Sequence, residues 1–349
     1  SMSLGLYLHI PYCFSKCRYC DFCSAPGQRG VPAEYPDALL RELAKNDRRP
    51  DTLYFGGGTP SVLPTECIAK LVNALKQYGF WQQPCEATIE VNPGTADLAK
   101  LQMLRSLGFD RISFGVQSLQ DDELRAIGRI HNAQQALEAL TLARKAGFAR
   151  ISADLIYGLP SQTLTSLQDT LERLTDTGIE HISVYGLIVE EGTPLASLVD
   201  KGRITLPDED TAADMYEFVQ SFLRERGFER YEISNYAKNG QYSRHNTVYW
   251  QYHPYMAFGA AACGERLLTA IEHHQDDLAL RRDADAGAGM AAVIVVGRAV
   301  HNRLAVLDQI DAAADGLLDL ILIGVVFTGA ADHGRAILQD RKEARRCAA

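Results

Sequence analysis

The sequence predicts an α/β fold in which parallel strands alternate with helices. Six short apolar segments with strand-like alternation occur between residues 4 and 187, and helical spacing of apolar residues follows each of the first five. This alternation favours a parallel sheet with its helices on the outside. Glycines and polar residues stand at the carboxyl ends of these strands, where α/β barrels place their chemistry. We therefore predict a partial (β/α)6 barrel of the TIM type with a site at that end.

The predicted strands are apolar and bounded by turn residues, and they cover residues 4–10, 52–55, 86–91, 111–115, 151–156 and 181–187. Apolar spacing predicts helices at residues 32–46, 64–78, 121–127, 133–146, 163–177 and 207–228, and one that ends at residue 107. A short polar strand is predicted at residues 231–236. We assign residues 1–205 to the barrel and residues 206–264 to an extension.

Composition limits the class of protein. The 349 residues can form one large domain or two, and an apolar content of 46% with 23% charged residues is typical of a globular protein. The net charge of −9 disfavours nucleic acid as the main partner, because phosphate binding needs a basic face. No apolar run reaches about 18 residues, so we expect no integral membrane segment. Clustered cysteines without a signal peptide predict a reducing, cytoplasmic location.

The loop after the first predicted strand carries a C-x3-C-x2-C set formed by Cys13, Cys17 and Cys20. Thiolates are soft ligands that select zinc or iron–sulfur clusters. A structural zinc site needs four ligands, usually two pairs, and no second pair follows here. Three thiolates on a four-iron cluster leave one iron open to a small molecule. A zinc loop and three buried thiols are the alternatives, and Cys23 is either a fourth ligand or a neighbouring free thiol.

Residues 56–60, G-G-G-T-P, follow the second predicted strand. Glycine lacks a Cβ, so this segment allows the backbone to approach a ligand closely. A tight strand-to-helix turn would use the same residues. Glu90 ends the third strand, where a lone acid is usually solvated, and Arg129 is able to pair with a carboxylate through two hydrogen bonds.

Together these motifs resemble the radical S-adenosylmethionine (SAM) superfamily. The resemblance implies that Cys13, Cys17 and Cys20 ligate a [4Fe–4S] cluster whose open iron chelates SAM. It implies SAM contacts by residues that match the superfamily's positions, namely Tyr7, Gly57, Gly58, Thr59, Glu90, Gln117, Arg129, Asp154 and Ile156. Asp154 is expected to accept from the ribose, and Ile156 to contact adenine. The implied chemistry is reductive cleavage of SAM to methionine and a 5′-deoxyadenosyl radical.

Further stretches resemble the coproporphyrinogen dehydrogenase group, and they are residues 7–13, 54–60, 114–118, 128–131 and 192–195. The true dehydrogenase has a long extension before its cysteine loop and a fourth cysteine two positions after the third. Here twelve residues precede Cys13, and Cys23 follows Cys20 by three positions. Residues 244–250, R-H-N-T-V-Y-W, contain instead the H-N-x-x-Y-W motif of the HemW family. The resemblance therefore favours HemW and implies that His245 ligates haem iron, the alternative being a hydrogen-bonded histidine at a domain seam.

The resemblance implies a haem chaperone that holds the cluster, SAM and haem and delivers haem to haem-requiring proteins, such as respiratory membrane enzymes. The alternative is an oxygen-independent coproporphyrinogen III oxidase that uses the 5′-deoxyadenosyl radical for oxidative decarboxylation. A cluster- or zinc-stabilised scaffold without SAM is a third hypothesis. A radical SAM protein acting on tRNA is a fourth, which the acidic charge disfavours. The sequence assigns no catalytic residue, recipient or oligomeric state.

The resemblance ends near Gly264. No proline follows Pro254, and Phe327 is the only aromatic residue after Phe258. HemW-like chains instead continue with an aromatic-containing segment and a winged-helix domain. We therefore expect residues 265–349 to be an atypical C-terminal segment, either a shifted reading frame or a divergent helical cap.

Overall fold

The computed structural model describes residues 4–22, 24–26, 34–44, 49–82, 86–260 and 262. Within these ranges the main sheet has the strand order β11-β1-β4-β5-β6-β7-β8-β10-β9. Its six central strands are mutually parallel, and they are β1 (Gly5–Ile10), β4 (Thr52–Gly57), β5 (Glu86–Val91), β6 (Arg111–Gln117), β7 (Arg150–Tyr157) and β8 (His181–Gly186). The predicted partial (β/α)6 barrel is confirmed.

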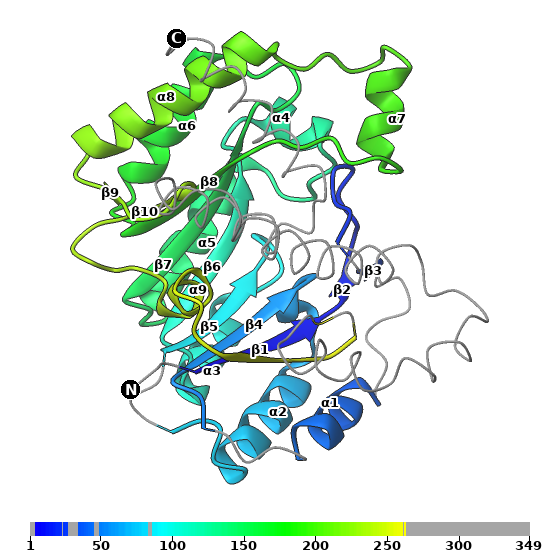
Figure 1. Cartoon of the computed structure of the whole chain (residues 1–349), viewed down its shortest axis with the longest axis vertical. Helices are drawn as coiled ribbons and strands as arrows, with labels where there is room; N and C mark the ends of the chain where they lie inside the picture. Colours follow the sequence, from blue (N-terminus) through cyan, green and yellow to red (C-terminus); the bar gives the residue numbers. More distant parts are fainter. Residues whose placement is uncertain are drawn as a thin grey trace, which may run out of the picture.

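The predicted helices are present as α1 (Tyr35–Leu43), α2 (Thr65–Gln77), α3 (Leu98–Leu107), α4 (Asp121–Ala126), α5 (Ala133–Lys145), α6 (Leu164–Thr175) and α8 (Glu209–Glu225). The sequence did not predict the short helix α7 (Pro194–Asp200). Figure 1 shows α1 and α2 at one end of the curved sheet and α6 and α8 at the other. Local signals fix where these helices begin. Asn132 accepts a hydrogen bond from the Gln135 amide at 2.8 Å, and the Gln135 side chain accepts from the Asn132 amide at 3.0 Å.

Each central strand sends apolar residues outward and polar residues inward, because successive side chains alternate between the two faces. On β4 the fully buried Leu53 and Phe55 belong to the core under the helices. Thr52 and Tyr54 lie on the other face, in register with Glu86 and Thr88 of β5. The inner face of the barrel is therefore polar, so its groups need partners inside the barrel.

Two edges of the sheet differ from the prediction. The strand expected at residues 231–236 is confirmed only for residues 235 and 236, because residues 231–234 form a turn. In this turn the Glu232 carboxylate accepts hydrogen bonds from the backbone amide of Ser234 and from the side-chain amide of Asn235. The turn joins β9 (Glu229–Arg230) to β10 (Asn235–Ala237), which pairs antiparallel with β8. At the other edge, β11 (Tyr255–Phe258) pairs parallel with β1, an element that the sequence did not predict.

The cysteine loop follows β1 and contains a short parallel pair, β2 (Tyr12–Cys13) with β3 (Ala25–Pro26). No helix in the part of the chain described above is long and apolar enough to cross a membrane. Cys23 and residues 265–349 lie outside the described residues, so the expectations for them are not tested.

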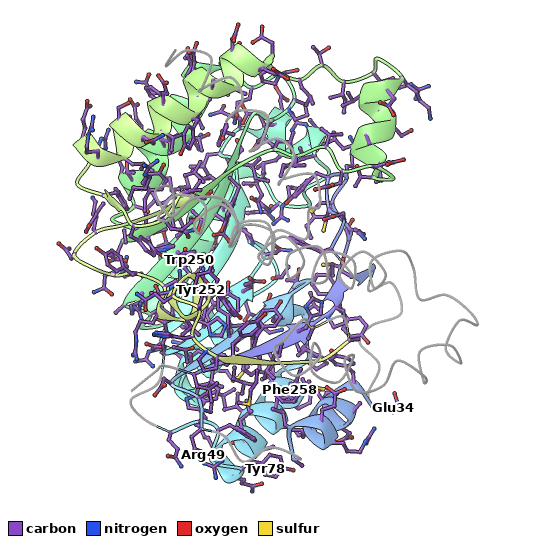
Figure 2. The ribbon with its side chains drawn as sticks, in the orientation of Figure 1. Glu34, Arg49, Tyr78, Trp250, Tyr252 and Phe258 are labelled. Carbon is purple, nitrogen blue, oxygen red and sulfur yellow. The ribbon has the colours of Figure 1, made fainter. Side chains whose placement is uncertain are left out.

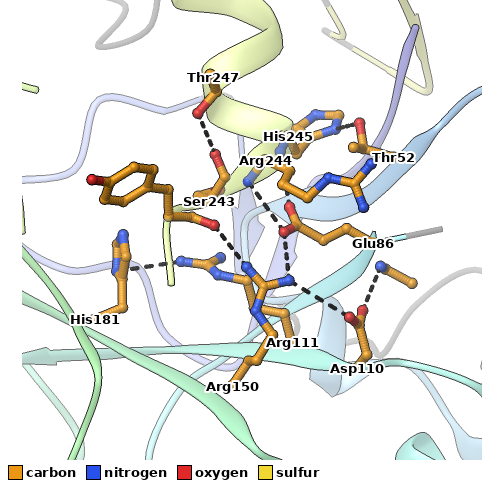
Figure 3. Close-up of polar contacts among 12 residues, drawn as sticks. Thr52, Glu86, Asp110, Arg111, Arg150, His181, Ser243, Arg244, His245 and Thr247 are labelled. Carbon is orange, nitrogen blue, oxygen red and sulfur yellow. Dashed lines mark hydrogen bonds and ion pairs between the residues drawn. The ribbon is translucent and has the colours of Figure 1, made fainter. Parts of the chain in front are cut away.

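A polar network at the amino ends of the strands closes the base of the barrel (Figure 3). We call this network the plug, and it consists of Thr52, Glu86, Arg111, Arg150, His181, Tyr231, Ser243 and His245. Ser243 caps α9 (Arg244–Trp250), which carries His245 into the plug. Trp250 and Tyr252 mark the far end of this short helix in Figure 2.

Glu86 is the buried carboxylate of the plug, with 1% of its surface exposed. Its carboxylate pairs with Arg150 Nη1 at 2.7 Å and accepts from the backbone amides of Arg244 and His245 at 3.1 and 2.8 Å. Arg150 also donates to the Tyr242 carbonyl at 2.7 Å. The Glu86–Arg150 ion pair thus connects strands β5 and β7 to Tyr242 and to the first two residues of α9.

We predict that Arg150→Met lowers the free energy of unfolding by about 3 kcal/mol, because Glu86 remains as a buried carboxylate without its cation. Lys70→Met is the matched control, since Lys70 pairs with Asp37 while both side chains are about half exposed. It should cost less than about 1 kcal/mol. Denaturant unfolding of the two variants measures both values, and equal losses would contradict the role given to the plug.

Candidate functional site

The cysteine loop and the glycine segment are joined at the carboxyl ends of β1 and β4. The Gly58 amide donates to the Ile10 carbonyl at 2.8 Å, and the Thr59 amide donates to the Tyr12 carbonyl at 2.7 Å. A Cβ on Gly58 would lie 2.6 Å from the Tyr12 carbonyl oxygen, closer than any real contact. Glycine is therefore required here so that the two loops can touch.

Two of the predicted thiol ligands accept hydrogen bonds from predicted SAM-site residues. Thr59 Oγ1 donates to Cys13 Sγ at 3.5 Å, and Arg129 Nη1 donates to Cys17 Sγ at 3.2 Å. Burial raises the pKa of the Cys20 thiol to about 11, and the nearby Cys17 and Cys13 add to that rise. The three cysteines are reduced and lie near enough to influence one another.

Arg129 connects the cysteine loop to the strands. Its Nη2 donates to Asn92 Oδ1 at 2.7 Å and to the Gly115 carbonyl at 2.6 Å, and Asn92 in turn donates to Thr59 Oγ1 at 2.7 Å. The Arg129 Nε hydrogen is buried without a partner among the described residues. A guanidinium whose unused donor is buried is suited to a ligand that carries a carboxylate.

Glu90 lies beside the glycine segment, at the end of β5. Its carboxylate accepts from Tyr54 Oη at 2.7 Å and from the Gly57 amide at 3.2 Å. Burial raises the pKa of Glu90 to about 7, although the Tyr54 hydrogen bond opposes that rise. The backbone amides of Gly57, Gly58 and Thr59 already donate to acceptors in the protein. A ligand at this corner therefore meets oxygen acceptors, such as the Glu90 carboxylate, instead of free amide donors. It is therefore suited to an ammonium group.

The remaining predicted contacts also lie at this end. Gln117 ends β6 with φ of +66°, a left-handed conformation that is uncommon for residues other than glycine. Asp154 on β7 accepts from Ser113 at 3.3 Å, and burial raises its pKa. Ile156 belongs to a small apolar cluster with Ile127 and Leu159, beside Tyr19 of the cysteine loop. We call the end formed by these groups and the three cysteines the mouth of the barrel.

Tyr7 lies lower, inside β1. Its ring stacks on Tyr54 with centroids 6.0 Å apart, and its hydroxyl is 3.1 Å from His9 Nδ1. The sequence predicts Tyr7 among the SAM contacts but gives no role to Tyr54 or Asn92. Position in the sequence was the available signal, because Tyr54 closely precedes the glycine segment and Asn92 follows Glu90 by two residues.

His245 is not at the mouth. It is fully buried at the base of the barrel, where Nδ1 is 2.8 Å from Thr52 Oγ1 and Nε2 is 2.6 Å from Tyr249 Oη. Burial, with a smaller effect of Arg111, lowers the pKa of His245 to about 3. Both ring nitrogens are therefore engaged, and this geometry corresponds to the hydrogen-bonded alternative.

Comparison with known proteins identifies the family. A sequence profile described as the radical SAM superfamily matches residues 7–174. The heme chaperone HemW of Bacillus subtilis is 40% identical over 264 residues, which cover 74% of this chain and 70% of that protein. The chain belongs to the HemW family of radical SAM proteins.

Other relatives agree with this family. The Haemophilus influenzae heme chaperone HemW is 38% identical, covering 75% of this chain and 70% of its own. The bovine mitochondrial radical S-adenosyl methionine domain-containing protein 1 is 33% identical, covering 87% of this chain and 70% of its own. Among solved structures, coproporphyrinogen III oxidase (HemN) from Escherichia coli superposes with a TM-score of 0.64 at 26% identity, covering 75% of this chain and 64% of that one.

The radical SAM domain implies a [4Fe–4S] cluster and SAM, and the mouth offers thiols and polar groups of the kinds that both need. Three free thiols share one loop, two of them already accept hydrogen bonds, and Arg129 has an unused donor. Within the described ranges, no three His, Cys, Asp or Glu side chains are gathered closely enough to hold a metal ion. Ligation of the cluster by Cys13, Cys17 and Cys20 therefore stays a prediction.

We predict that His245 makes the fold sensitive to acid. Its pKa is about 3 when folded and about 6.5 when unfolded, so only the unfolded chain takes up its proton between these values. The free energy of unfolding is unaffected above pH 6.5 and falls as pH drops below it, by about 1.4 kcal/mol per unit. Denaturant unfolding at pH 7 and pH 5 should therefore show about 2 kcal/mol less loss for His245→Phe than for wild type. The same loss in both proteins would contradict the buried, neutral state.

Proposed function

We propose that this chain is a haem chaperone of radical SAM architecture. It holds a [4Fe–4S] cluster on Cys13, Cys17 and Cys20, binds SAM at the mouth, binds haem, and delivers haem to haem-requiring proteins such as respiratory membrane enzymes. It acts in the cytoplasm. The observation that carries the proposal is the identity of 40% and 38% to two heme chaperones HemW, over 74% and 75% of this chain.

The mouth supports the SAM part of the proposal through groups of complementary charge. Glu90 faces the position suited to an ammonium group, and Arg129 faces one suited to a carboxylate. Asp154 is available to accept from ribose hydroxyls, and the apolar cluster around Ile156 suits adenine. When bound, the cluster supplies one electron and an open iron site for SAM. The protein residues orient SAM and exclude water.

The haem ligand implied by the resemblance is His245, and this assignment remains part of the proposal. In the described structure its ring is enclosed by Thr52, Tyr54 and Tyr249. Ligation of haem iron by His245 therefore requires the ring to leave this enclosure and one ring nitrogen to lose its hydrogen bond to Thr52 or to Tyr249. The proposal of haem binding does not depend on this ligand.

The second candidate is oxygen-independent coproporphyrinogen III oxidase, which the superposition on HemN favours. That structure is 26% identical to this chain, and the chain spans 64% of it, so the likeness supports the fold more than the reaction. The two candidates predict different products, because only the oxidase forms decarboxylated porphyrinogen in step with 5′-deoxyadenosine.

We predict that the full chain, with its cluster reconstituted anaerobically, takes up one equivalent of haem and forms no decarboxylated product. Haem is titrated while the Soret band is followed, and the same samples are incubated with coproporphyrinogen III, SAM and reductant. His245→Ala tests the implied ligand, and His253→Ala, just beyond the end of α9, is the matched histidine control. Product formation without haem uptake would show that the chain is the oxidase. Haem uptake unchanged by His245→Ala would place the ligand elsewhere.

A further inference from the structure

The plug and the mouth are connected through stacked rings inside the barrel. The His245 ring stacks on Tyr54 with centroids 5.0 Å apart and planes 27° apart, and Tyr54 also stacks on Tyr7 at 6.0 Å and 26°. The Tyr54 hydroxyl then donates to Glu90 Oε1 at 2.7 Å. One side chain therefore spans from the buried base to the carboxylate at the mouth.

His245 is fixed by hydrogen bonds from its ring and backbone and by close packing. Its ring nitrogens bond Thr52 and Tyr249, its backbone amide donates to Glu86, and its Cε1 lies 3.2 Å from the position of a Cβ on Gly5. Any larger residue than glycine at position 5 would push the ring away. A ring held this firmly is a rigid support for Tyr54, since an interior group that is fully packed has one arrangement.

Glu90 needs such support because its own contacts are few. It accepts one hydrogen bond from Tyr54 and one from the Gly57 amide. If the His245 ring were removed, Tyr54 could shift into the space it leaves. Glu90 would then lose its shorter hydrogen bond and its position beside the glycine segment.

We propose that His245 is a positioning residue for the SAM end of the barrel: its ring supports Tyr54, and Tyr54 fixes the Glu90 carboxylate beside the glycine segment. The proposal rests on SAM binding at the mouth, which both candidate functions share, and does not rest on haem. It gives the H-N-x-x-Y-W helix a role in the described structure that needs no change in the contacts of His245.

The pH dependence of SAM affinity is a second readout, and it depends on the charged and titratable groups around Glu90. Tyr54 faces it from β4, Tyr7 from β1, Arg111 from β6 and Asp154 from β7. The Tyr54 hydrogen bond lowers the Glu90 pKa, which lies at about 7. An ammonium group binds the ionised carboxylate, so SAM affinity should rise as pH increases through that value. Loss of the Tyr54 contact should move the midpoint to higher pH.

The experiment measures the dissociation constant of SAM by anaerobic equilibrium dialysis between pH 5.5 and 8.5, on the full chain with its cluster reconstituted. For His245→Ala we expect about tenfold weaker binding at neutral pH, the typical effect of removing a group that orients a ligand, and a midpoint at higher pH. Tyr54→Phe should move the midpoint in the same direction. His245→Phe keeps a ring under Tyr54 and should restore binding to within about twofold of wild type.

Tyr231→Phe is the matched control, because Tyr231 bonds His181 and Ser243 in the plug and has no contact with Tyr54 among those described. Wild-type binding by this control, with a defect in His245→Ala that His245→Phe restores, supports the proposal. Unchanged SAM binding by His245→Ala, or equal defects in His245→Ala, His245→Phe and Tyr231→Phe, overturns it. Haem titration of the wild type is read separately, so failure of the haem chaperone function leaves this result intact.

Discussion

The ion pair of Glu86 and Arg150 is the interaction on which the interior of this barrel depends. A partial barrel with a polar inner face has to satisfy those groups without water at its base. Glu86 does so by accepting from Arg150 and from the first amides of α9, so a single carboxylate joins β5, β7 and the helix. The Glu86 carboxylate thereby ties down the start of α9, and the hydrogen bond to Thr52 holds the His245 ring where it stacks on Tyr54.

The two ends of the barrel perform different physical tasks. At the base every polar group described in the plug is engaged, which favours a fixed structure. At the mouth, some groups are incompletely paired. The Arg129 Nε hydrogen has no acceptor among the described residues, and burial raises the pKa of the Glu90 carboxyl. Perturbed and incompletely paired groups at the carboxyl ends of parallel strands are typical of a ligand site. The central strands connect the two ends, since Thr52 and Tyr54 belong to the same strand.

Much of this arrangement could be predicted from the sequence, for reasons that differ by element. The six parallel strands were predicted because their outward residues, such as Leu53 and Phe55, alternate with inward polar ones. The mouth could be placed because short motifs follow strand ends. The edge strand β11 could not be predicted, because its pairing with β1 is a tertiary contact. The turn at residues 231–234 could not be predicted either, because the side-chain hydrogen bonds of Glu232 leave no periodic signal in the sequence. The motif around His245 was recognised, but its burial against Thr52 depends on contacts 193 positions apart.

The central claim is that three cysteines at the mouth hold a four-iron cluster that leaves one iron open to SAM. Electron paramagnetic resonance of the reconstituted, reduced full chain, recorded with and without SAM, tests it most directly. We predict a [4Fe–4S] signal that changes when SAM is added, because the amino and carboxylate groups of SAM bind the open iron. Zinc in place of iron, or a cluster signal that saturating SAM leaves unchanged, would contradict the account.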